Sequence, residues 1–252
     1  MEASEACPEG KAEGCGNGED EMSSITYDAG NMTITVDGLD TVERALGDLK
    51  RKTPAAAKVA INATAREARK LMIAKAKARY AVNAAGKRHL KDLVQRKKAT
   101  NKSLSAEIHI AKMRNDLGYF LTNPPYPTHY TGTQWVNGPD VWYGKVLKAS
   151  SMKPLPGEGN RGKAFLAEFK SGHIGMVQRV IGSSSGNNLT AKGRPRWRNA
   201  NGKVEKLVTL GSPSATAMHR TIWPEVEPDV EEFLHDRLNA QVQKVLAKSG
   251  RA

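Results

Sequence analysis

The feature that most constrains the fold is a helical pattern that starts at Thr53-Pro54 and runs to about residue 80. Thr53 is predicted to be the N-cap and Pro54 to occupy the first helical position. At 1.5 Å per residue, this helix is about 40 Å long. One face carries an apolar stripe made of Ile61, Ala65, Ala68, Met72 and Ala76. Because the stripe is mostly alanine, we expect another element to pack close against it.

Alternating apolar residues predict strands elsewhere in the chain. Residues 24–37 alternate on both sides of a break at residues 29–31, which predicts a hairpin. Residues 104–110 alternate again, and residues 85–94 favour a short helix before them. From Pro228 onwards, apolar residues recur at helical spacing, with acids at the start and lysines at the end, as the helix dipole favours. These patterns predict an α+β fold, with a mostly antiparallel sheet packed against a long basic helix and a C-terminal helix.

The remaining segments are irregular in composition. Residues 1–22 are acidic and Gly-rich, which predicts a disordered leader before a single domain at 23–252. Residues 122–139 and 182–203 exceed ordinary connection lengths, so each is predicted to be a functional or flexible loop. Two cysteines, both in the leader, are too few for a structural zinc site. We expect no signal peptide, no transmembrane helix, no metal and no cofactor.

The formal net charge of +13 is concentrated in one segment. Residues 41–116 carry 20 lysines and arginines against six acids. Such a segment suits nucleic acid or an acidic protein surface, although a solvated helix face gives the same pattern. Aromatic side chains for base stacking are scarce there, which disfavours sequence-specific binding. The candidate contacts are Lys87, Arg88, Lys91, Arg96, Lys97 and Lys98, together with the basic cluster Arg194, Arg196 and Arg198.

Residues 162–179, GKAFLAEFKSGHIGMVQR, pose a choice between a catalytic loop and a structural hairpin. Ser171-Gly172 is predicted to form a two-residue turn with His173 beside it. A catalytic histidine needs a nucleophile, a carboxylate or a metal as partner. The acid close in sequence is Glu168, which is predicted to lie opposite about Gly175. The pattern therefore favours a structural hairpin, and the scattered histidines are interpreted as surface residues.

The order of these segments resembles the minor tail protein Z family of tailed bacteriophages and prophages. A small strand segment is followed by a helix with NATAREAR, a basic helix and strand, the hairpin, and GSPSATAMHR before an acidic C-terminal helix. The similarity spans about residues 35–248. It is carried by Asn62, Thr64, Ala65 and Arg69, by Ala164, Phe165, Ser171, Gly172, His173, Gly175 and Arg179, and by Pro213-Ser214.

This resemblance implies a structural component of the virion at the head-proximal end of the tail, made in the host cytoplasm. Such a protein acts in tail completion and head-tail joining, without enzymatic activity or cofactor. The implied partners are other tail and neck proteins, namely the tail terminator, the tail tube and the head-tail connector. The resemblance also implies a homo-oligomeric ring that has no membrane contact and lies near packaged DNA.

Two alternatives remain open on the residues alone. The first is a sequence-nonspecific nucleic-acid-binding protein that uses the basic segment 41–116, whose affinity would fall steeply with salt. The second is a hydrolase that uses His173 and Glu168.

Overall fold

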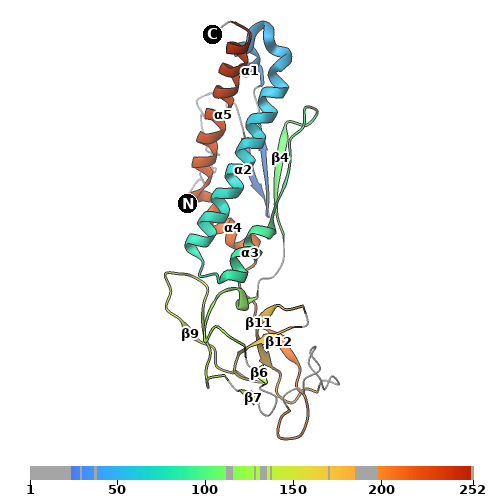
Figure 1. The fold of residues 1–252 in the computed structure, drawn as a ribbon, viewed down its shortest axis with the longest axis vertical. Coiled ribbons are helices and arrows are strands. Elements are labelled where there is room, and N and C mark those ends of the chain that lie inside the picture. Colours follow the sequence, from blue (N-terminus) through green and yellow to red (C-terminus); the bar gives the residue numbers. More distant parts are fainter. Residues whose placement is uncertain are drawn as a thin grey trace, which may run out of the picture.

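The computed structural model describes residues 24–28, 30–36, 39–111, 116–127, 129–130, 135–136, 138–169, 171–184 and 198–250. The predicted leader, most of loop 182–203, and Arg194 and Arg196 lie outside these residues. Figure 1 shows an elongated molecule, with long helices on a sheet at one end and short strands at the other. We call these ends the helical lobe (β1–β4, α1, α2 and α5) and the β lobe (η2 and β5–β12).

The helical lobe contains a four-stranded antiparallel sheet in the order β1-β2-β4-β3. Helix α2 lies along this sheet and α5 packs beside α2 (Figure 1). The predicted α+β class is therefore confirmed. The strands are β1 (Ser24–Asp28), β2 (Asn31–Thr35), β3 (Val94–Lys97) and β4 (Ser105–Ile110), and the two long helices are α2 (Thr53–Arg79) and α5 (Glu227–Lys248).

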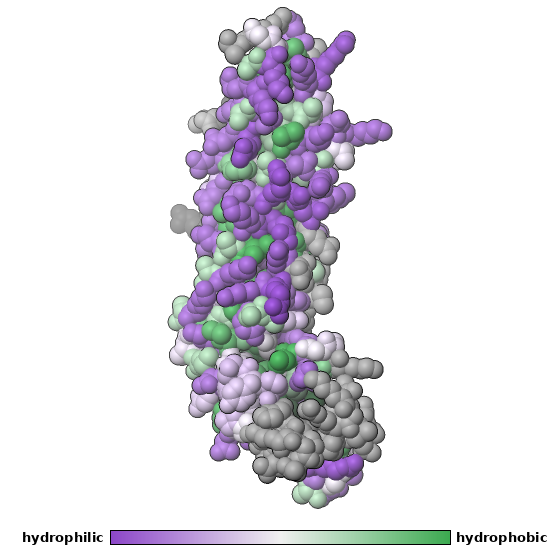
Figure 2. Space-filling view, in the orientation of Figure 1, coloured by the Kyte–Doolittle hydropathy of each residue, from purple (hydrophilic) through white to green (hydrophobic). Residues whose placement is uncertain are grey.

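The core of the helical lobe forms where the apolar stripe of α2 meets α5 and the sheet. All five predicted stripe residues are fully buried. Three of the five are alanines, whose small side chains suit the packing of α5 against α2. Met32 and Ile34 from β2, and Leu234 and Leu238 from α5, belong to the same aliphatic cluster. Over the face seen in Figure 2, the outer surface of this lobe is mostly hydrophilic, so its apolar residues are used mainly inside.

The start of α2 differs from the prediction. Helix α1 (Leu39–Leu46) and the 3₁₀ turn η1 (Gly47–Lys52) lead directly into α2, which already includes Thr53. The prediction that Thr53 caps the helix is therefore wrong. Its side chain is fully buried, and its hydroxyl has no hydrogen-bond partner among the described residues. Pro54 still lies in the first turn, where a missing N–H costs little.

The β lobe is built from short strands around aromatic side chains. Phe120, Trp142 and Phe165 are buried in a second cluster, to which α2 contributes Ala76. The described residues of predicted loop 122–139 include the end of β5 and the short pair β6–β7. The elements are η2 (Leu117–Tyr119), β5 (Leu121–Asn123), β6 (His129–Tyr130), β7 (Trp135–Val136), β8 (Tyr143–Lys145), β9 (Lys153–Pro154), β10 (Phe165–Glu168), β11 (Ile174–Arg179) and β12 (Leu207–Thr209).

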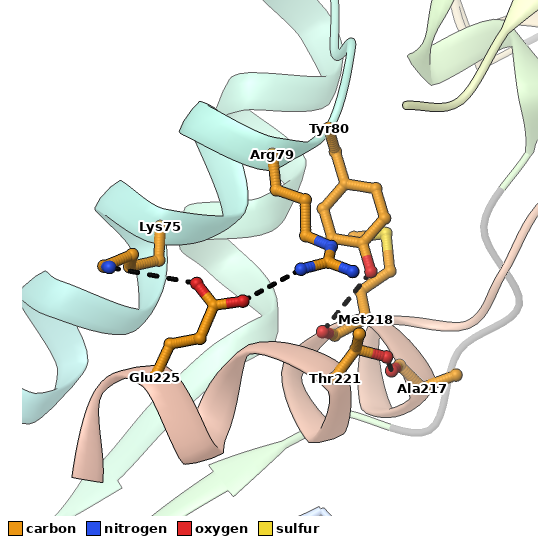
Figure 3. Close-up of polar contacts among 7 residues, drawn as sticks. All are labelled: Lys75, Arg79, Tyr80, Ala217, Met218, Thr221 and Glu225. Atoms are coloured by element: carbon orange, nitrogen blue, oxygen red, sulfur yellow. Dashed lines mark hydrogen bonds and ion pairs between the residues drawn. The ribbon is translucent and has the colours of Figure 1, made fainter. Parts of the chain in front are cut away.

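The lobes meet where α2 ends, beside α3 (Ala84–Leu93), α4 (Ala215–Ile222) and η3 (Trp223–Glu225). Pro213 precedes α4, whose N-cap Ser214 accepts a hydrogen bond from the Ala217 amide at 3.2 Å. Figure 3 shows Glu225 between Lys75 and Arg79, at 3.8 and 2.9 Å. Helix α2 contributes residues to both clusters, so the two lobes share a continuous helix. The assignment of 23–252 to one domain stays a prediction.

Among the helices that the structure describes, none is long and apolar enough to span a bilayer.

Candidate functional site

The hairpin at 162–179 forms, but with a different turn and register from the prediction. The Phe169 amide donates to the His173 carbonyl at 2.8 Å, so the turn is one residue longer than the predicted Ser171-Gly172 pair. Gly172 adopts φ +78°, the left-handed conformation that closes a three-residue hairpin loop. Glu168 consequently pairs with Ile174, while Gly175 pairs with Ala167.

The carboxylate that contacts His173 is Asp116, which lies far away in the sequence. Asp116 Oδ2 is 2.9 Å from His173 Nε2. Its other oxygen accepts hydrogen bonds from the amides of Gly118, at 2.7 Å, and Met176, at 3.0 Å. The prediction that Glu168 is the available acid is therefore wrong. Asp116 was missed because its role depends on η2 lying against β11, which no local pattern reveals.

Two aromatic rings pack against His173. The Tyr119 and Phe169 ring centroids lie 4.7 and 5.8 Å from that of His173, and His89 stacks on Tyr119 at 4.1 Å. Burial, and secondarily the Asp116 carboxylate, raises the pKa of the Tyr119 hydroxyl. A Cβ added at Gly175 would collide with the Asp116 carboxylate and would lie 2.6 Å from Phe169. Gly175 is thus the residue that lets this cluster close.

The arrangement around His173 is typical of a structural joint. Asp116 is 8% exposed and is committed to two backbone amides, so it fastens η2 to β11. Within the described residues, no hydroxyl or thiol side chain hydrogen-bonds to His173. At the far end of the hairpin, the Arg179 guanidinium carbon lies 4.7 Å from the centre of the buried Phe165 ring. Together with the close approach at Gly175, these contacts give structural roles to four of the residues that carry the family resemblance, namely Phe165, His173, Gly175 and Arg179.

The predicted cationic residues do not form one patch. Lys87, Arg88 and Lys91 are exposed on α3. Lys97 lies on the opposite face of the sheet from α2 and pairs with Glu107 at 3.2 Å. Arg198 donates locally to the Gly202 carbonyl at 2.6 Å. Strand β3, which positions Arg96 and Lys97 on opposite faces, was not predicted.

Two residues of the NATAREAR motif fasten the basic strand to α2. Asn62 exchanges two hydrogen bonds with the backbone of Ala99, each 3.0 Å long. Arg69 donates to the carbonyls of Lys91 and Val94, both at 2.7 Å, and so satisfies backbone groups at the end of α3. Thr64, between them, is fully buried, with its hydroxyl unpartnered among the described residues.

Beside this joint lies a hollow of about 260 Å³, which we call the basic hollow. Its lining is Lys58, Val59, Asn62, Arg66, Arg96 and Lys98. Arg96 reaches it from β3 and donates to the Asn62 carbonyl at 3.2 Å. Burial, together with the charges of Arg66 and Arg69, lowers the pKa of Arg96. The geometry therefore brings two of the predicted cations, Arg96 and Lys98, together with two from α2.

The histidines differ from the predicted surface distribution. His219 is fully buried in α4, and neither ring nitrogen has a hydrogen-bond partner among the described residues. Burial lowers its pKa to about 4. His109 does point outwards, as predicted, with Nδ1 2.6 Å from the Asn31 side-chain oxygen. In the part of the chain that the structure describes, no three His, Cys, Asp or Glu residues cluster as a metal site would require.

Comparison of the chain with protein-family models, with curated proteins and with solved structures finds no match.

Proposed function

We propose that this chain is a structural component of a bacteriophage or prophage tail that acts in tail completion and head-tail joining. The observation that carries this proposal is the role of the residues behind the family resemblance. Asn62 and Arg69 bind α3 and β3 to α2, while His173 and Gly175 meet at Asp116. Residues that hold elements together are what a virion scaffold needs, whereas an enzyme needs reacting groups placed to meet a substrate.

The proposed role also accords with the chemistry at the hairpin. His173 has an aromatic environment and a carboxylate engaged by backbone amides, which suits a rigid joint and supports a non-enzymatic role. The elongated shape in Figure 1 suits a ring subunit whose two ends contact different neighbouring proteins. We accordingly propose a homo-oligomer in the virion, with the tail terminator, tail tube and head-tail connector as partners.

The test is deletion of the coding sequence from the phage or prophage genome that carries it, followed by electron microscopy of the lysate. The proposal predicts filled heads and separate tails of normal length that do not join. Complementation with the unaltered gene restores joined particles, whereas Gly175→Leu, which cannot fit beside Asp116, does not. Intact, infectious particles from the deletion would refute the proposal.

A second candidate function, sequence-nonspecific binding of nucleic acid by segment 41–116, is favoured by the basic hollow. The two functions are compatible, because a protein at a head-tail junction lies beside packaged DNA.

A further inference from the structure

The cations of the basic hollow differ from their neighbours in how their charge is balanced. Lys70, Lys75, Arg79 and Lys97, on the same helix or strand, each lie within 4 Å of a carboxylate. The hollow brings together four cationic side chains, and none of its described lining residues is acidic. Arg66 and Lys98, both exposed, have no ion pair among the described residues. An acid-free group of four cations is stabilised when an anion enters.

The hollow is held in shape by contacts that leave its cations available. Both amide protons of Asn62 are used, on the carbonyls of Lys58 and Ala99, and its oxygen accepts from the Ala99 amide. Asn62 therefore forms a fixed wall. One Arg96 nitrogen is held by the backbone carbonyl of Asn62 at 3.2 Å, and its remaining donors have no hydrogen-bond partner among the described residues.

The spacing along α2 explains why these side chains converge. Lys58, Asn62 and Arg66 follow one another at four-residue intervals, which places them on one helix face. In β3, Val94 and Arg96 lie on the face turned towards α2; Val94 is buried, and Arg96 emerges next to Asn62. Lys98 follows the end of the strand. A helix face and a strand end thus approach one point from different directions.

We propose that the basic hollow binds a phosphate group of a nucleic-acid backbone. Donors arrive from α2, from β3 and from the segment after β3, which suits the tetrahedral oxygens of a phosphate better than a planar carboxylate. The volume of about 260 Å³ is large enough to admit a phosphate group. Val59, 45% exposed, also lines the hollow, and its aliphatic side chain cannot hydrogen-bond to a base edge.

This inference rests on the second candidate function, and the experiment separates the two. Binding of a short fluorescein-labelled DNA duplex of arbitrary sequence is measured by anisotropy over a salt series from about 0.05 to 0.2 M. The test variant is Arg66→Gln/Lys98→Gln, because both side chains are exposed and make no hydrogen bond among the described residues. The matched control, Lys244→Gln/Lys248→Gln, removes the same charge from exposed positions of α5, outside segment 41–116.

We expect the test variant to bind about tenfold or more weakly and the control to stay close to wild type. The slope of log affinity against log salt becomes shallower by about 0.9 in the test variant, because the hollow neutralises one phosphate and each neutralised phosphate contributes about 0.9. Arg66→Lys, which keeps the charge, retains most of the slope. Unchanged circular dichroism and melting temperature show that the variants are folded.

Three results would overturn the proposal. If both double variants lose affinity equally, the chain binds DNA through diffuse charge, and the second function stands without the hollow. If wild type does not bind the duplex at all, both fail. If poly-glutamate of matched length competes as well as unlabelled duplex does, the hollow recognises an acidic protein surface instead.

Discussion

The two lobes achieve their folds by different means. In the helical lobe, two long helices and a four-stranded sheet bury an aliphatic cluster in which many residues are fully inaccessible. In the β lobe, strands of two to six residues surround aromatic side chains, and single contacts such as the Asp116 hydrogen bonds join the pieces. The first arrangement spreads stability over a periodic pattern, whereas the second concentrates it in particular residues.

The largest loss of stability is expected from a substitution that leaves a cavity in the helical lobe. Leu234 is fully buried where α5 joins the aliphatic cluster. Leu234→Ala is expected to lower the free energy of unfolding by about 2–5 kcal/mol, through lost burial and the cavity left behind. Urea unfolding followed by circular dichroism measures this loss. Leu207→Ala is the matched control, because Leu207 is 37% exposed on β12 and the same change should cost well under half as much.

The same contrast explains what the sequence reveals. The stripe of α2 and the alternation of β4 repeat over many residues, so both were predictable from spacing alone. Strand β3 could not be predicted from the sequence, because Val94–Lys97 is too short and too basic to show alternation. The contact of Asp116 with His173 could not be predicted either, because tertiary structure brings together residues that lie 57 positions apart.

A pH-dependent effect of similar size is expected at α4, between the lobes. The pKa of His219 is about 4 in the folded protein, against about 6.5 for an unfolded chain. The unfolded state therefore binds a proton first, and stability falls as pH drops from about 6.5 to about 4, by about 3 kcal/mol in all. Unfolding free energies measured between these pH values test this. His219→Leu should remove that part of the pH dependence; an unchanged profile would assign it to other groups.

The dependence of the β lobe on particular residues can be tested by replacing Asp116. Asp116→Ala leaves the amides of Gly118 and Met176 without their carboxylate acceptor, which we expect to cost about 2 kcal/mol. Hydrogen exchange should show lost protection in β10 and β11, with α2 and α5 little changed. Asp140→Ala provides the control, because Asp140 is fully exposed, its contact with the half-exposed Lys163 is 3.8 Å long, and its removal should leave exchange unaltered. A uniform loss of protection across both lobes would contradict the contrast drawn here.

The smallest expected effect concerns the ion pairs of Glu225, which connect η3 to the end of α2 (Figure 3). These side chains are 42–47% exposed, so Glu225→Gln should cost only about 0.5 kcal/mol at low salt. The difference should largely vanish at about 1 M salt, where the Debye length is about 3 Å. Glu107→Gln, which breaks the Lys97 pair within the helical lobe, is the matched control. If Glu225→Gln costs several times more than Glu107→Gln, or if its cost persists at high salt, the connection between the lobes depends on desolvated charge as well as on the continuous α2 helix.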